Sequence, residues 1–141
     1  MKLNIIPIKN NFDLVSTVVA EAIRRYALED EVSVTEIDPS LADTESFFEQ
    51  YEWPPEHGAN CVVVEAKRGD KRWMAACLVL ATTRVDINNV VRRHLGARKA
   101  TMAKMNKTLE ETSMEYGGVT PIGLPDDWPL LVDSKILKLE Q

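Results

Sequence analysis

The sequence of 141 residues has few of the side chains that most enzymes use for acid–base or metal chemistry. It contains two histidines, His57 and His94, and two cysteines, Cys61 and Cys77. Two cysteines without a second pair or a histidine cluster fit neither a disulfide framework nor a zinc site. We therefore expect both thiols to be reduced and packed in the core, and we expect no bound metal and no cofactor.

Signals for membrane insertion and for export are lacking as well. No apolar run approaches membrane-spanning length, and the segment Met1–Pro7 has neither the apolar core nor the small-residue cleavage site of a signal peptide. We therefore expect a cytoplasmic protein. The length is ordinary for one domain, and a hydrophobic content of 45% suffices for a core. We expect residues 1–141 to form a single domain.

Common catalytic motifs are also missing. The sequence has no P-loop, no nucleophile elbow and no HExxH pair. His57 precedes an expected strand and could line a pocket, although an ordinary loop histidine is the simpler interpretation. Asp133-Ser134 is more typical of a helix cap than of a nucleophile with its base. Taken alone, these residues predict a fold and not a mechanism.

The net charge of −5 is unevenly distributed along the chain. Residues 26–56 contain ten acidic residues and no lysine or arginine, whereas residues 87–109 contain basic residues and no acidic one. The basic residues are Arg92, Arg93, Arg98, Lys99, Lys104 and Lys107. A basic region within an acidic protein suits a phosphate backbone, but a solvated face of two helices explains it equally well.

Hydrophobic periodicity and turn residues predict an α/β fold. We expect a strand at 3–8, a helix from a cap at Asn11 to Tyr26, a short strand at 32–37 and a helix around 47–51. Residues 61–66 and 73–81 should form a hairpin around Gly69, across which Cys61 and Cys77 could face each other, and the second strand should be central. A helix capped by Asp86, with Ile87, Val90, Val91 and Leu95 inward, should end at Gly96. A strand at 97–101, a helix at 106–114 and a strand at 129–132 should follow.

The most distinctive segment is Gly117–Pro125, the glycine loop, which holds three of the six glycines and two prolines between apolar residues. Glycine allows close backbone approach, and each proline fixes its own φ and restricts the residue before it. A loop constrained in this way can hold peptide N–H and C=O groups against a ligand. A rigid connector between a helix and a strand is the simpler interpretation.

Together with its neighbours, this loop carries a resemblance to a known family. The run Gly-Gly-Val-Thr-Pro-Ile-Gly-Leu-Pro, preceded by Leu95-Gly96-Ala97-Arg98-Lys99 and followed by Leu131-Val132-Asp133, resembles the YbaK/EbsC family over about residues 58–137. These are free-standing aminoacyl-tRNA editing proteins related to the editing domain inserted in bacterial prolyl-tRNA synthetase. The resemblance implies a mixed, barrel-like sheet flanked by helices. It also implies hydrolysis of the ester of a mischarged tRNA, without a cofactor, in translation quality control.

The resemblance also implies roles for individual residues. The backbone of the loop would hold the aminoacyl group and orient the ester, while the terminal ribose hydroxyl or a water assists. The resemblance assigns catalytic roles to Gly117, Gly118, Pro121 and Asn60. It assigns contacts with the substrate to Val119, Thr120, Gly123, Asp133 and His57. Arg92, Arg93, Arg98 and Lys99 are expected to bind tRNA. A further partner from the translation machinery, or a second copy of the chain, is compatible with this scheme.

Two departures from the family pattern leave the function open. Asn60 stands where the family has a lysine that contacts the tRNA end, so a charge-assisted contact would be lost. Lys99 or Lys67 could supply a cation from another direction. The family pattern also continues after Asp133 with a Gly-rich turn, a strand and a closing helix, whereas this sequence ends at Gln141. The chain is therefore either a trans-acting deacylase or a catalytically weakened module that binds tRNA, a nucleotide or a protein partner.

Overall fold

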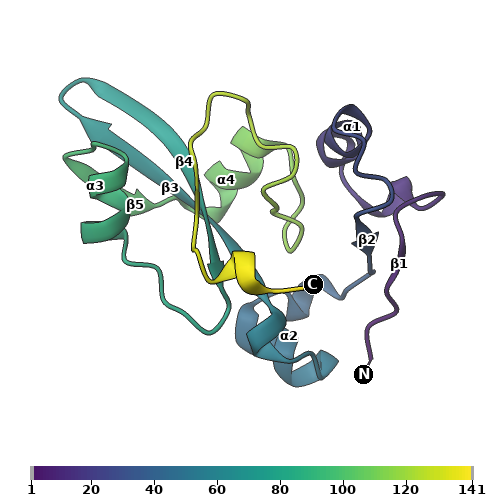
Figure 1. Ribbon diagram of the computed structural model, residues 1–141. Coiled ribbons are helices and arrows are strands. Elements are labelled where there is room, and N and C mark those ends of the chain that lie inside the picture. The colour runs from purple at the N-terminus through teal and green to yellow at the C-terminus, as the bar shows by residue number, and fades with distance from the viewer. Residues whose placement is uncertain (1, 141) are drawn as a thin grey trace. The chain divides into compact units, whose positions relative to one another are not determined.

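The computed structural model describes residues 2–140, which divide into two compact units. The first unit comprises the chain up to Pro54 together with Leu109–Leu124, and the second comprises Pro55–Thr108 and the chain from Pro125 onward. Figure 1 shows the path of the chain through both. The expectation of a single domain stays a prediction.

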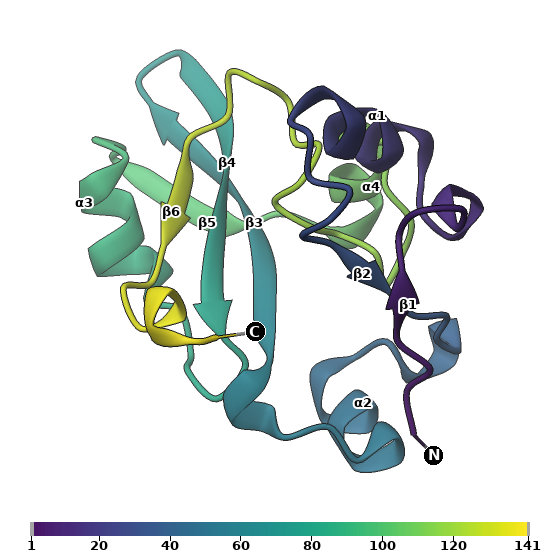
Figure 2. The same cartoon turned by 45° about the vertical axis from the view of Figure 1, so that its right-hand side comes forward.

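The second unit is built on a four-stranded mixed sheet. Its strands are β3 (Ala59–Arg68), β4 (Lys71–Leu80), β5 (Lys99–Met102) and β6 (Leu130–Val132), in the order β5-β3-β4-β6 (Figure 2). β3 pairs antiparallel with β4 and β5, and β6 pairs parallel with β4. The predicted hairpin and its central second strand are confirmed. The described residues form open sheets, so the barrel-like part of the prediction is not confirmed.

An apolar cluster on this sheet explains why β4 is central. Val64, Ala75, Cys77 and Val79 are buried and pack with Val91 from the segment after β4. Strand register places Cys61 opposite Leu78 and Cys77 opposite Val62, so the two cysteines do not form a directly facing pair. Burial raises the pKa of each thiol from 9.0 to about 11. Both are free, as expected, and packing is their evident role.

The helical segment after β4 differs from the predicted helix. The Asp86 carboxylate accepts from the Asn89 N–H, as predicted for a cap, but the first turn Ile87–Val91 is a π turn in which the Val91 N–H donates to the Asp86 oxygen at 3.0 Å. Only Arg92–His94 (α3) is α-helical. The wider turn adds a residue and shifts the helical phase. Val90 is consequently 53% exposed, and its predicted inward position is wrong.

The first unit has a small two-stranded sheet and two helices. β1 (Ile6–Pro7) pairs antiparallel with β2 (Ser33–Val34), and the helices are α1 (Thr17–Arg25) and α2 (Thr44–Tyr51). The prediction that Asn11 caps a helix running to Tyr26 is wrong. The Asn11 side-chain amide donates to the Pro7 and Lys9 carbonyls, and a 3-10 turn Phe12–Leu14 precedes α1, which starts after Ser16. Ile8, Val19, Ile23 and Met114 form the core.

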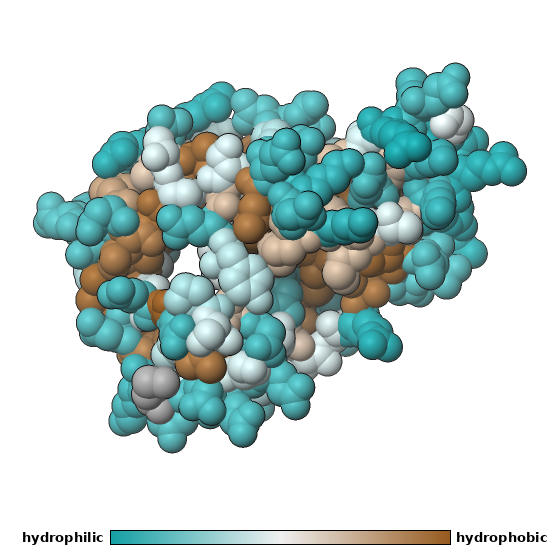
Figure 3. All heavy atoms as spheres, turned by 180° about the vertical axis from the view of Figure 1, so that it is seen from behind, coloured by the Kyte–Doolittle hydropathy of each residue, from teal (hydrophilic) through white to brown (hydrophobic). Residues whose placement is uncertain are grey.

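The remaining elements are short. α4 (Met105–Thr112) begins in the second unit and ends in the first, and 3-10 turns cover Pro39–Leu41, Pro55–His57 and Ile136–Lys138. Within residues 2–140, no helix combines the length and apolar character needed to cross a membrane. The face in Figure 3 shows brown hydrophobic residues in several places among teal hydrophilic ones. Exposed apolar side chains of the molecule include Met102 and Leu137, at 60% and 79%.

Candidate functional site

The glycine loop belongs to the first unit up to Leu124 and is held by close backbone contacts at two glycines. Gly123 has φ +99°, and a Cβ atom built on it would lie 2.9 Å from the Val18 oxygen in α1. Gly117 has φ +84°, and its Cβ would lie 2.9 Å from the Ala42 Cβ. Any other residue would overlap at these two points and would adopt an unfavourable φ. The shape of the loop therefore depends on both glycines.

Apolar side chains and short-range hydrogen bonds fix the loop between those contacts. Val119, Ile122 and Leu124 pack against the core of the first unit. The Thr120 hydroxyl accepts from the Ile122 N–H at 3.3 Å, and the Thr120 N–H points to the Met114 sulfur at 3.5 Å. Thr120, predicted to contact substrate, thus also braces the loop. The segment is therefore anchored along most of its length and is not a loose connector.

One part of the loop presents backbone to solvent. Gly117 and Gly118 are both exposed. Gly118 does not have a positive φ, and the nearest atom to a Cβ built on it is the Glu115 oxygen at 3.4 Å, the same oxygen that accepts from its N–H at 2.8 Å. Within residues 2–140, the N–H groups of Val119, Gly123 and Leu124 donate to no protein atom. The loop therefore combines a rigid frame with an open glycine face and unused amide donors.

Three other predicted site residues lie at one end of the sheet in the second unit. His57 ends a 3-10 turn just before β3, and Asn60 is the second residue of β3, where it pairs with Val79 near the end of β4. Asp133 follows β6, and its N–H donates to the Leu78 oxygen at 2.9 Å. Its carboxylate accepts from the Lys135 N–H at 3.0 Å, but the N-cap of the following 3-10 turn is Lys135 and has no side-chain cap, so the predicted cap at Asp133-Ser134 is wrong. The strand pairing thus brings these three residues to the same sheet end.

Of the proposed substitutes for a lysine at position 60, Lys67 lies at the other end of β3, and Lys99 lies beside it in β5. Lys67 is seven residues along β3 from Asn60 and pairs with Lys99. At about 3.3 Å per residue, this separation is about 23 Å, and an odd spacing points the two side chains to opposite faces of a strand. Neither Lys67 nor Lys99 can therefore replace a lysine at position 60 in the same contact.

The predicted tRNA-binding residues divide into two kinds. Arg92 donates from Nε to the Asn88 oxygen at 2.8 Å and from Nη1 to the Ala97 oxygen at 3.3 Å, so its guanidinium braces the turn around α3. Arg93, Arg98 and Lys99 are exposed. Of the four, these three have the access to solvent that binding a phosphate backbone requires. Their role in binding tRNA stays a prediction.

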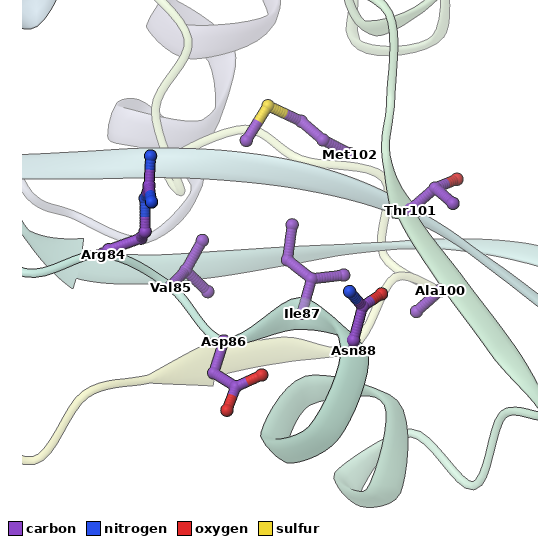
Figure 4. A pocket seen from close by; sticks show the side chains of 8 residues that line it. All are labelled: Arg84, Val85, Asp86, Ile87, Asn88, Ala100, Thr101 and Met102. Atoms are coloured by element: carbon purple, nitrogen blue, oxygen red, sulfur yellow. The ribbon is translucent and has the colours of Figure 1, made fainter.

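A pocket of about 500 Å³ in the second unit contains none of the predicted site residues. It is lined by the loop after β4 and by β5, through Arg84, Val85, Asp86, Ile87, Asn88, Ala100, Thr101 and Met102. In Figure 4 the Val85 and Ile87 side chains point toward the side where Met102 lies, whereas the Asp86 carboxylate points away. No motif marked this pocket in the sequence, because it results from the π turn and from β5 beside it. Among residues 2–140, no three His, Cys, Asp or Glu side chains gather to form a metal site.

Two solved structures have a similar fold. One is described as a proposed trans-editing enzyme for prolyl tRNA synthetase, with 20% identity and a TM-score of 0.67, covering 86% of this chain and 73% of that one. The other comes from work on epitope backbone grafting by computational design onto scaffold proteins, with 18% identity, a TM-score of 0.68 and coverage of 88% and 75%. At such identities the likeness shows the fold alone. No curated protein matches the chain.

The sequence itself provides the stronger comparison. Residues 38–141 match the aminoacyl-tRNA editing domain family, a range that includes the glycine loop, Asn60 and the basic residues. The family suggested by the loop and its flanking motifs is thereby confirmed. The chain belongs to the aminoacyl-tRNA editing domain family.

Proposed function

We propose that this protein is a trans-acting deacylase that hydrolyses the ester between a mischarged amino acid and the terminal ribose of tRNA. The oxygen of a water molecule adds to the ester carbonyl carbon. The bond from that carbon to the ribose oxygen then breaks, and a proton of the same water passes to the ribose oxygen. The products are a free amino acid and a tRNA with a free hydroxyl. Family membership supports the substrate class.

The observation that carries the proposal is the exposed Gly117–Gly118 backbone on a rigid frame. Charge that develops on the carbonyl oxygen of an ester is stabilised best by donors already in place. The unused N–H of Val119 directly follows Gly118 and belongs to such a frame. In this assignment the backbone at Gly117 and Gly118 faces the ester, Pro121 and Gly123 keep the loop in shape, and Val119 and Thr120 flank the aminoacyl group.

Residues of the second unit contribute to binding in this proposal. Asn60, His57 and Asp133 contact the end of the tRNA, and the exposed Arg93, Arg98 and Lys99 bind its backbone. Because tRNA editing takes place where proteins are synthesised, the cytoplasmic location and any partner from the translation machinery remain part of the proposal. A second copy of the chain is the other partner to test.

A second candidate function rests on Asn60. Position 60 carries no cation for the tRNA end, and the two lysines considered as substitutes, Lys67 in β3 and Lys99 beside it in β5, lie near the far end of β3. This arrangement favours a module that keeps the glycine loop and binds tRNA but hydrolyses the ester slowly. Asparagine still donates hydrogen bonds, so the deacylase remains our main proposal.

A panel of misacylated tRNAs tests both candidates. Each tRNA carries a labelled amino acid, and release of the label is compared with and without protein, with correctly charged tRNAs as the control. We expect at least one mischarged tRNA to be hydrolysed faster than its spontaneous rate while its correctly charged counterpart is spared. Binding of tRNA without release of any amino acid above background would support the module instead.

A further inference from the structure

Three cationic residues form a row across adjacent strands of the second unit. Lys67 in β3 is paired with Arg72 in β4 and with Lys99 in β5, next to the turn of the β3–β4 hairpin at the upper left of Figure 1. Paired residues share a face of the sheet, and neighbouring strands lie about 4.8 Å apart, so the row spans about 10 Å. Like charges directly opposite each other destabilise a sheet. The presence of these three cations side by side is therefore not explained by the stability of the sheet.

An acidic group beside the row, Glu65, is already engaged by Lys107. Glu65 lies two residues before Lys67, and its Oε1 accepts from the Lys107 Nζ at 2.9 Å while lying 3.9 Å from the Arg72 Nη1. Lys67 and Lys99 make no ion pair within the part of the chain that the structure describes. All three cations are exposed, with 66% of the Arg72 side chain accessible.

Neighbouring residues add to the positive charge. The hairpin segment 67–72 carries Lys67, Arg68, Lys71 and Arg72 against one acid, Asp70, which gives a net charge of +3. Arg98 is exposed and its N–H donates to the Lys67 oxygen at 2.9 Å, which holds it beside the row. A cluster of this sign within a protein of net charge −5 suits a polyanion.

We propose that the Arg72–Lys67–Lys99 row binds phosphates of the helical part of tRNA, away from its aminoacyl end. A duplex strand carries one phosphate per about 3.4 Å of helix axis, so a row of about 10 Å aligned with that axis spans roughly three of them. The separation of about 23 Å from Asn60, toward an opposite face of β3, places the row beyond a contact with the last nucleotides. This assignment rests on the proposed tRNA substrate and adds Lys67 and Arg72 to its binding surface.

The test compares two RNA probes and two triple variants of equal charge. The probes are a deacylated minihelix of the acceptor stem with its 3′ end, and the single-stranded 3′ tetranucleotide alone. The row variant carries Lys67→Gln, Arg72→Gln and Lys99→Gln. The control carries Lys2→Gln, Lys135→Gln and Lys138→Gln, all exposed and all outside the row and the hairpin segment 67–72. Affinity is measured over a range of salt concentrations.

For the minihelix, we expect the row variant to reduce the slope of log affinity against log salt by about 2. Each lost phosphate contact lowers the magnitude of this slope by about 0.7–0.9. The control variant should keep the parent slope. For the tetranucleotide, the parent and both variants should agree. Thermal melts check folding, and if the row variant does not fold, Lys67→Gln and Lys99→Gln should each flatten the slope by about 0.7–0.9.

Equal slopes for row and control variants would overturn the proposal, as would a parent that does not bind the minihelix at low salt. Polyglutamate that binds as tightly as the minihelix with the same dependence on the row would identify an acidic protein instead. Because the probes are deacylated, these results are independent of ester hydrolysis. If the row variant lowers the salt dependence of minihelix binding but the protein hydrolyses no ester, the proposed deacylase is contradicted. Phosphate binding by the row is then still supported.

Discussion

The Gly123 backbone lies directly against the Val18 carbonyl of α1, because a Cβ atom at position 123 would be 2.9 Å from the Val18 oxygen. This contact joins the glycine loop to α1, in which Val19, Ala20, Ala22 and Ile23 are buried. Val19, the residue after Val18, is buried in the core of the first unit. The geometry of the loop is therefore tied to the core, and a change at Gly123 acts on stability.

Gly123→Ala should lower the free energy of unfolding by about 2–5 kcal/mol, since both the overlap with Val18 and the φ of +99° oppose a side chain. Gly69→Ala is the matched control. Its φ is also positive, at +58°, but nothing lies within 4 Å of its Cβ, so we expect a loss of about 1–2 kcal/mol. Urea denaturation measures both. Equal losses would show that the Val18 contact does not restrain the loop.

The pair of Glu65 and Lys107 predicts a specific dependence on pH. The Lys107 hydrogen bond lowers the pKa of Glu65 below its ordinary value of 4.5. A lowered pKa in the folded state stabilises the protein above about pH 4.5, and this contribution is lost as the pH falls through the folded-state value. Lys107→Gln should therefore destabilise the protein by about 0.2–1 kcal/mol at pH 7 and by progressively less below pH 4.5.

Denaturation of parent and Lys107→Gln at several pH values checks this expectation. Lys104→Gln serves as the control, because Lys104 is exposed on the same segment and has no ion pair within residues 2–140. A difference between parent and Lys107→Gln that stays constant from pH 7 to pH 3 would mean that the hydrogen bond to Glu65 contributes nothing measurable.

Asn60→Lys should restore a charged contact with the end of the tRNA. Asn60 is half-buried at the start of β3, where the stem of a lysine can lie along the strand while its ammonium reaches solvent. We expect affinity for the 3′ tetranucleotide to rise by about tenfold, which corresponds to about 1.4 kcal/mol. Asn60→Met is the control of similar length without charge. The same affinity in both variants would mean that Asn60 is not at the tRNA end.

Local sequence signals predicted the elements that depend on neighbouring residues. The apolar run Trp73–Ala81 and the turn at Gly69 predicted the central hairpin, because burial on both faces and a tight turn are encoded locally. The Asp86 cap was also predicted correctly. The cap at Asn11 was wrong, since the carbonyls of Pro7 and Lys9 compete for its side chain. Val90 was misplaced because a π turn shifts the helical phase.

The site depends on contacts between distant segments, which periodicity does not reveal. Three glycines and two prolines marked Gly117–Pro125 as a shaped loop, but only the structure shows that Gly117 approaches Ala42 and that Gly123 approaches Val18. The alignment of Lys67 with Lys99 likewise follows from the register of β3 and β5. Register is set by packing across the whole sheet, so a one-residue slip would have separated these charges.

Single-turnover hydrolysis of the best mischarged tRNA by the parent and by Gly118→Val tests the central claim most directly. Gly118 has no positive φ, and its nearest neighbour lies 3.4 Å from a built Cβ, so we expect the variant to fold, as a thermal melt will show. A β-branched side chain on the exposed backbone should block the ester and slow release of the amino acid by about 100-fold or more. A folded Gly118→Val variant that hydrolyses the ester at the parent rate would contradict the account.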